Sequence, residues 1–171
     1  RLRRTGGFTL IELLVVITVL AVLMVAAAPA MTDMIMNNRM VGVSNDLLAD
    51  LAAARSESLR RSQRVVFCKN SGDDASCSTS VNWENGWLLY LDVNSNTTLD
   101  VGETILRVRQ ALPAGYTINP AGIGDTVVVR PVGLVTPAGT LRICDSRTGN
   151  YGRLITIAAG GRASAAAATC P

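Results

Sequence analysis

The chain opens with a long apolar pattern. In the run FTLIELLVVITVLAVLMVAAA, which starts at Phe8, only Thr9, Glu12 and Thr18 are polar. About twenty-one helical residues span roughly 30 Å, the thickness of a bilayer's hydrocarbon core. The pattern therefore predicts a transmembrane helix over residues 8–29.

A second pattern, with helical periodicity, follows Pro29. Proline in a helix interior removes a hydrogen bond and crowds the preceding turn, so we expect a kink or a local break there. The next apolar residues recur at spacings of three and four, which predicts an amphipathic helix over residues 30–64 and places Asp46 and Asp50 mostly away from the apolar stripe. The stripe consists of Met36, Met40, Val43, Leu47, Leu51 and Ala54.

The rest of the chain changes to short runs typical of β-strands. Turn-rich pieces such as KNSGDD, PAGIGD and SRTGNYG separate these runs, as expected for antiparallel hairpins. We predict an α+β fold in which the long helix packs on a β-rich globular domain over residues 65–171. The tail GGRASAAAATCP approaches low complexity, and no strand is predicted in it. The predicted strands are RVVFCK, GWLLYLD, TILRVRQ, YTIN, DTVVVR, TLRIC and RLITIA.

The flanks of the apolar run indicate its orientation. Arg1, Arg3 and Arg4 precede it, and positive charge favours the cytoplasmic side of a membrane. The globular part is then expected on the far side. A secretory signal cleaved near AAAPA, after the apolar run, is the alternative.

The string RTGGFTLIELLVV resembles the signal of type IV prepilins and type II secretion pseudopilins. The resemblance implies that a prepilin peptidase removes the leader, residues 1–7, by cutting between Gly7 and Phe8, and that the new amine of Phe8 is methylated. It also implies a type IV pilin-like fold and a single pass through the inner membrane with the C-terminal domain in the periplasm. The mature chain would then join other major and minor pilins in a helical filament, extracellular or periplasmic.

Glu12 is the one charged residue within the apolar run. A charge at the centre of a bilayer costs roughly 2.5–3.5 kcal/mol even on lenient scales. In a pilin filament the Glu12 carboxylate can face the N-terminal amine of a neighbouring Phe8, and pairing removes most of that cost. The alternative, which we expect before assembly, is that Glu12 reaches the cytoplasmic headgroups.

Four cysteines lie beyond the predicted membrane span, where an oxidising compartment permits disulfides. Three pairings are formally possible. We favour Cys68 with Cys77, which closes a small loop, and Cys144 with Cys170, which ties the tail to a strand. A zinc site is the less favoured interpretation, because the sequence has neither histidine nor CxxC spacing.

The segments FCKNSGDDASC, WENGWLLYLDVNSNTTLDVGETILRV and RICDSRTGNYGRLITI resemble the FimT/FimU minor pilins and the related H-type (GspH-like) pseudopilins. This resemblance implies a low-abundance subunit at or near the pilus tip that supports pilus biogenesis. FimT-like members bind double-stranded DNA for natural transformation, and DNA uptake is therefore one alternative function. A type II secretion pseudopilin is the other.

Charge gives partial support to a DNA-binding role. Residues 104–171 hold seven arginines against two aspartates, a net charge of +5, whereas residues 30–103 have a net charge of −4. A basic lobe can attract phosphates without reading bases. The tail has only the first half of the GRxR motif of FimT-like proteins, and ordinary solvated arginines explain the charge equally well. The candidate DNA-binding residues are Arg142, Arg147, Arg153 and Arg162.

The segment DVNSNTTLDVGE has the ligand spacing of a calcium-binding EF-hand loop. Against calcium, Thr97 stands where the sharp turn requires glycine, and strands flank the loop. We therefore favour a polar hairpin loop that needs no cofactor. The candidate calcium ligands are Asp92, Asn94, Asn96, Asp100 and Glu103.

Catalysis is not expected from this chain. The sequence contains no histidine, no Gly-rich phosphate loop and no serine or cysteine in a recognisable nucleophile context. It reads instead as the substrate of two enzymes, a peptidase and a methyltransferase.

Overall fold

The computed structural model of the chain describes residues 7–171, so the predicted leader, apart from Gly7, lies outside the described residues. The chain divides into two units, Arg1–Asn38 and Arg39–Pro171. The first unit holds the N-terminal part of the long helix. The second holds the rest of that helix and all described strands.

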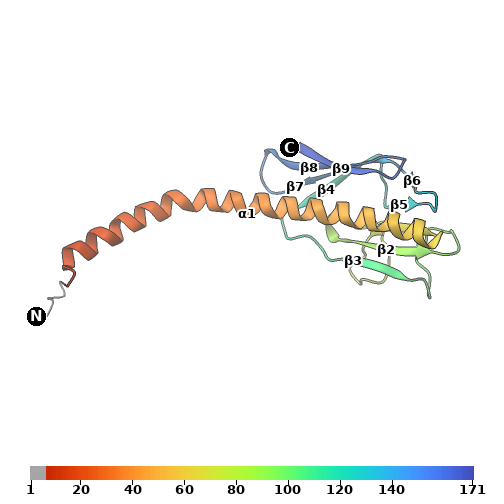
Figure 1. The fold of residues 1–171 in the computed structure, drawn as a ribbon, viewed down its shortest axis with the longest axis horizontal. Helices are drawn as coiled ribbons and strands as arrows, with labels where there is room; N and C mark the ends of the chain where they lie inside the picture. Colours follow the sequence, from red (N-terminus) through yellow and green to blue (C-terminus); the bar gives the residue numbers. More distant parts are fainter. Residues whose placement is uncertain (1–6) are drawn as a thin grey trace, which may run out of the picture. The chain divides into compact units, whose positions relative to one another are not determined.

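Within residues 7–171 one long helix precedes a short 3-10 helix and nine strands (Figure 1). The α+β fold with antiparallel strands is confirmed. The elements are α1 (Leu10–Arg61), β1 (Arg64–Lys69), η1 (Trp83–Asn85), β2 (Trp87–Asp92), β3 (Ile105–Arg109), β4 (Thr117–Ala121), β5 (Thr126–Val129), β6 (Val135–Thr136), β7 (Gly139–Cys144), β8 (Gly149–Ile157) and β9 (Ala163–Cys170).

All seven predicted strands are present, but the helix is shorter than expected and two strands were missed. α1 ends at Arg61, because Ser62 turns into the left-handed region (φ +53°) and Arg64 already begins β1. The short strand β6 and the tail strand β9 had no signal in the sequence. Alanine has a low β propensity, so β9 forms through its pairing with β8 rather than through its own composition.

The strands form two antiparallel sheets. One has the order β3-β2-β1-β5-β6 and the other the order β4-β7-β8-β9. Residues of both sheets and of α1 contribute to one hydrophobic core, which includes Leu47, Phe67 and Ile155. The second part of α1 thus belongs to the folded domain (Figure 1).

The predicted apolar stripe of α1 faces this core from Met40 onward. Met40, Leu47, Leu51 and Ala54 are buried. The expectation that Asp50 lies mostly outside the stripe is wrong, since its side chain is fully buried. It lies three residues after the buried Leu47, on the same side of the helix, and its burial is possible because the sheet supplies hydrogen-bond donors to it.

Three donors from β2 and β3 meet the Asp50 carboxylate. Arg107 donates from Nη1 (2.8 Å) and Arg109 from Nε (2.8 Å), and Trp87 donates from its indole Nε1 (2.9 Å). In the β2–β3 register Trp87 stands opposite Arg109, while Arg107, two residues from Arg109, shares its face of the strand. We call these four residues the Asp50 clamp.

In the first unit, α1 continues through Pro29 instead of breaking there. Among the described residues, no single helix passes the length and hydropathy criteria for crossing a membrane. The parts of α1 on either side of residues 26–29, Leu10–Val25 and Ala30–Arg61, pass only together, as one bent pair. The transmembrane segment over residues 8–29 stays a prediction.

The clamp predicts a marked difference between two neighbouring aspartates. Asp50→Ala should lower the free energy of unfolding by about 3 kcal/mol. The change removes the buried carboxylate with which Arg107 and Arg109 pair, and it leaves the indole N–H of Trp87 without an acceptor. Asp46→Ala, which removes a half-exposed partner of Arg109 at 3.2 Å, should cost less than about 1 kcal/mol. Urea unfolding of both full-length variants in detergent measures the difference, and equal losses would contradict the clamp's importance.

Candidate functional site

The first turn of α1 carries the prepilin-like motif. The Thr9 hydroxyl accepts a hydrogen bond from the backbone N–H of Glu12 (3.3 Å), and helix α1 begins at Leu10. Thr9 is therefore the N-cap, and Glu12 stands three residues later, the spacing of a capping box. The N-cap role of Thr9 was not predicted from the sequence, although the T-x-x-E spacing is the signature of a capping box.

The side chains in the N-terminal part of α1 are exposed. Large apolar residues from Phe8 to Val25 are 46–83% exposed. The polar side chain of Thr18 is satisfied within the helix, since its hydroxyl donates to the Leu14 and Val15 carbonyls. The outer surface of this part of α1 is thus apolar all round, apart from Glu12 and the two threonines, which is the surface of a helix that contacts lipid or other helices.

Two disulfides lie in the domain. Cys68 joins Cys77 and Cys144 joins Cys170, with Cα–Cα distances of 5.7 Å in both. These are the pairs favoured from the sequence. The first closes the loop after β1, and the second ties the end of β9 to β7, which anchors a strand that is otherwise mostly alanine.

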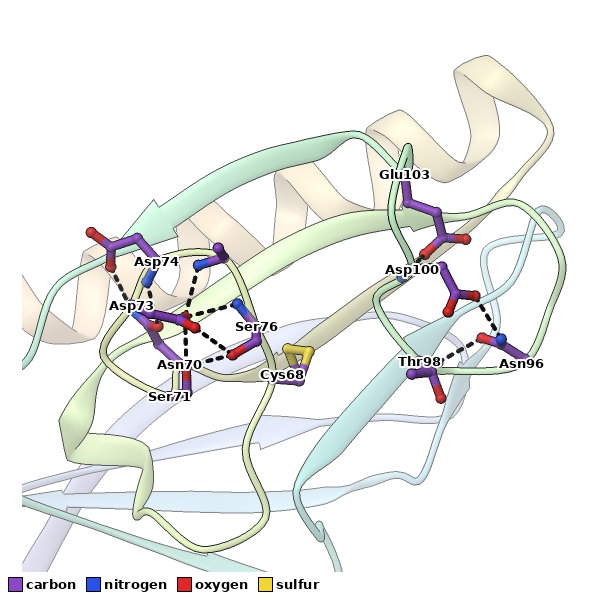
Figure 2. Close-up of a disulfide and its surroundings, with 12 residues drawn as sticks. Cys68, Asn70, Ser71, Asp73, Asp74, Ser76, Asn96, Thr98, Asp100 and Glu103 are labelled. Atoms are coloured by element: carbon purple, nitrogen blue, oxygen red, sulfur yellow. Dashed lines mark hydrogen bonds between the residues drawn. A yellow bond between two sulfur atoms is a disulfide. The ribbon is translucent and has the colours of Figure 1, made fainter.

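The disulfide loop holds its own network of hydrogen bonds (Figure 2). The Asp73 carboxylate accepts from the Ser71 hydroxyl (2.6 Å) and from the backbone N–H groups of Ala75 and Ser76. The Ser71 hydrogen bond, followed by the others, holds the pKa of Asp73 well below its usual range. The loop is therefore ordered by its own polar groups as well as by Cys68–Cys77.

The candidate calcium loop is closed by its own donors. The Asp100 carboxylate accepts from the side-chain amides of Asn94 and Asn96, both at 2.7 Å, and these bonds, that of Asn94 first, lower the pKa of Asp100. Figure 2 shows Asn96, Asp100 and Glu103 in this loop. The amide nitrogens of both asparagines therefore point to Asp100, whereas calcium would require their oxygens.

The carboxylate of Asp92, at the start of the loop, also has partners within the protein. Asp92 is buried, accepts the backbone N–H groups of Asn96 and Thr97, and lies 3.4 Å from Nη2 of Arg64. Thr97 adopts φ +65°, the conformation for which an EF-hand uses glycine. Among the described residues, no group of three or more His, Cys, Asp or Glu side chains is arranged to hold a metal ion.

The four candidate DNA-binding arginines do not share one surface. Arg142 pairs with Leu154, and the next residue, Ile143, pairs with Arg153, so the two arginines point to opposite faces of the sheet. Arg147 lies before β8 and Arg162 after it, at ends of a nine-residue strand about 30 Å apart.

Arg147 is also neutralised locally. Its Nη2 lies 2.7 Å from the Asp145 carboxylate, and its guanidinium carbon lies 4.1 Å from the ring centroid of Tyr151. Because Asp145 offsets its charge and Tyr151 packs on its guanidinium, Arg147 should attract a phosphate group only weakly. The +5 charge of the C-terminal region is therefore distributed rather than concentrated.

Comparisons with known proteins identify the family. The profile described as "Type II transport protein GspH" matches residues 43–161, and the "Prokaryotic N-terminal methylation motif" matches residues 2–28. The chain belongs to the GspH family. It is thus a relative of the type IV minor pilins and pseudopilins.

Solved structures agree with this assignment at the level of the fold. A crystal structure of the type IV minor pilin FimU from Pseudomonas aeruginosa aligns with a TM-score of 0.58 and 21% identity, covering 74% of this chain and 87% of FimU. A second crystal form of FimU gives a TM-score of 0.56 and 20% identity, with 73% and 90% covered. A search of curated protein sequences gives no significant match.

The two family matches divide the GspH-family chain by role. The methylation motif includes Gly7, Phe8 and Glu12, the residues of the predicted processing and assembly site. The GspH match ends at residue 161, just before Arg162 and strand β9. The family is one of structural pilin-type proteins, which associate with other pilins or pseudopilins and whose N-terminal motif a prepilin peptidase processes.

The geometry of the polar loop generates a prediction about calcium. Millimolar Ca²⁺ should leave the thermal unfolding midpoint of the full-length chain within experimental error of its value in Mg²⁺, because amide donors already occupy the Asp100 carboxylate. Asp92→Ala should lower the free energy of unfolding by about 1–3 kcal/mol in either ion, since it leaves the part-buried N–H groups of Asn96 and Thr97 without their acceptor and removes the ion pair with Arg64. A calcium-specific increase that Asp92→Ala abolishes would contradict this account.

Proposed function

We propose that this GspH-family chain is a minor pilin subunit of a type IV pilus, incorporated at or near the tip, where it supports pilus assembly. The observation that carries the proposal is the exposed apolar part of α1, residues 10–25, with Glu12 in its capped first turn. The likeness of its fold to FimU, a type IV minor pilin, supports the choice of a pilus.

The exposed helix explains why such a chain needs partners. A large apolar side chain gains about 1.5–3 kcal/mol when it leaves water, and none of those from Leu10 to Val25 is buried by its own domain. Lipid covers the helix before assembly. In a filament the helices of neighbouring subunits take the place of lipid, so the same surface serves first as the inner-membrane anchor and then as the assembly interface.

Glu12 selects between these two environments. Its position in the first turn, close to the partial positive charge of the helix N-terminus, stabilises its carboxylate modestly. Cleavage after Gly7 would add a positive amine at Phe8, and the amine of an adjacent subunit would neutralise Glu12 when the helices pack. An unpaired Glu12 favours the headgroup region, and a paired one favours the filament.

The chain acts here as a structural subunit and not as an enzyme. It is the substrate of a prepilin peptidase, which cuts before Phe8, and of a methyltransferase, which modifies the new amine. The domain of residues 39–171 would lie in the periplasm before assembly and on the filament afterwards.

A type II secretion pseudopilin is the second candidate. The family profile itself, described as a type II transport protein, favours it. Both candidates use the same N-terminal helix and the same processing. They differ in the machine that polymerises the chain, which a deletion strain distinguishes: loss of surface pili with normal secretion supports the pilus, and the reverse supports the pseudopilin.

The Glu12 pairing predicts a selective defect in assembly. In the deletion strain, Glu12→Leu should insert into the membrane and be processed at Phe8 as efficiently as the wild type, because an apolar residue costs nothing in lipid. It should nevertheless be reduced about tenfold or more in sheared filaments, given a buried pair worth several kcal/mol. Immunoblots of membranes and sheared filaments measure both quantities, with Thr18→Leu as the matched control.

Normal incorporation of Glu12→Leu would contradict the pairing. Equal loss of Thr18→Leu would indicate a general sensitivity of the helix to substitution, and would contradict it as well.

A further inference from the structure

Three segments of the domain meet around a groove of 580 Å³. The exposed side of α1 forms one wall, and the turn between β8 and β9 forms the other. The turn between β5 and β6 lies beside the groove, since a Cβ atom at Gly133 would lie 3.2 Å from Nε of Arg55 and 3.7 Å from Cδ2 of Leu59. The main lining residues are Leu48, Ala52, Arg55, Leu59, Arg162 and Ala163. We call this the Arg55 groove.

Two glycine turns pack beside the Arg55 side chain. Gly133 (φ +79°) and Gly161 (φ +76°) both lie against it, and a Cβ atom at either position would come within 3.2 Å of the Arg55 Nε. Any other residue at these positions would push the guanidinium away, besides straining the backbone. The absence of a side chain at both glycines therefore leaves the room in which the Arg55 side chain packs.

Neither cation of the groove has a counter-charge within the domain. Among residues 7–171, Arg55 and Arg162 have no carboxylate within ion-pair distance, whereas Arg60 and Arg61 in the next turn of α1 both pair with Glu57. The rest of the lining is mostly apolar, and Leu59 is 48% exposed. The groove thus combines an apolar floor with two unpaired guanidinium groups.

We propose that the Arg55 groove binds an acidic segment of a different pilin subunit that lies next to this chain in the filament. A carboxylate of the neighbour pairs with Arg55 and Arg162, which suit it through their forked donors, while an apolar side chain next to that carboxylate covers Leu48, Leu59 and the adjoining alanines. This inference rests on the proposed filament function and adds a specific contact between globular domains to it.

The chemistry of the groove favours an acidic protein segment over nucleic acid. A phosphate backbone presents a row of charges that remain hydrated, so its contacts use several exposed cations and gain nothing from an apolar floor. Stacking of unpaired bases requires aromatic side chains, and the groove lining contains none. A protein segment with one carboxylate and one apolar side chain uses every part of the groove.

Photocrosslinking within filaments tests the proposal. The full-length chain carries a benzoylphenylalanine at Leu59 or, as a control, at Val101, which is fully exposed in the polar loop between β2 and β3. After irradiation, sheared filaments are analysed by mass spectrometry. Leu59 should crosslink to a peptide of another pilin subunit that contains Asp or Glu, and Val101 should not crosslink to that peptide.

Charge variants show whether the arginines matter. Arg55→Gln combined with Arg162→Gln should reduce the Leu59 crosslink about tenfold, as expected for two lost charge-assisted hydrogen bonds. Arg142→Gln, which removes an exposed arginine elsewhere in the domain, should leave it unchanged. Arg55→Glu together with a carboxylate-to-arginine change in the crosslinked neighbour should restore it, which a folding defect could not do.

The possible failures are distinguishable. If the chain is absent from sheared filaments, the proposed function itself is overturned, and the groove proposal with it. If the chain is present but Leu59 crosslinks to DNA, to a second copy of this chain or to a segment without a carboxylate, the groove proposal alone is overturned. Persistence of the crosslink in the double arginine variant would also overturn it.

Discussion

The buried carboxylate of Asp50 fixes how the helix meets the sheet. A carboxylate removed from water without partners costs several kcal/mol, so the fold is favourable only when Trp87, Arg107 and Arg109 all reach it. These donors reach it together because the β2–β3 register puts them on one face, and a shift of one residue would turn a strand's donors away. The hydrophobic contacts around Leu47 and Leu51 are non-directional, whereas the hydrogen bonds of the Asp50 clamp require one position of the helix on the sheet.

The rest of the domain follows from that arrangement. With α1 held on the five-stranded sheet, its other side borders the turn between β8 and β9, and Arg55 lies beside the turns at Gly133 and Gly161. The disulfide between Cys144 and Cys170 holds the far end of β9. The helix therefore carries two surfaces with separate requirements: a domain side that is buried and ion-paired, and an N-terminal segment that remains apolar and exposed until lipid or other subunits cover it.

Local signals in the sequence were sufficient for much of this structure. The short β-type runs RVVFCK and GWLLYLD predicted β1 and β2, and apolar spacing predicted the stripe from Met40 to Ala54. Asp50 could not be placed in the same way, because an aspartate is buried only when distant donors reach it, and those donors are 37 to 59 residues away in sequence. Strand β9 was missed for a similar reason, since its alanines acquire strand structure from pairing with β8.

The candidate sites divide along the same line. The N-terminal motif is local, so Gly7, Phe8 and Glu12 could be identified from a short string. The EF-hand spacing of residues 92–103 is also local, but the direction in which Asn94 and Asn96 point depends on Asp100 and could not be read from spacing. The sequence showed that the C-terminal region has a positive net charge, but not where its arginines lie on the surface. The structure places the four candidate DNA-binding arginines on two faces and at two ends of a sheet. Arg55 had no sequence signal at all, because its setting is made by two turns far along the chain.

The central claim is that this chain is processed as a prepilin and built into a filament. The most direct measurement is mass spectrometry of the wild-type protein's N-terminal peptide, with its copy number, in sheared filaments. The account predicts a peptide that begins at Phe8 with a methylated amine, at far lower abundance than the major pilin. A chain that is missing from filaments, or that retains Gly7 there, would contradict it.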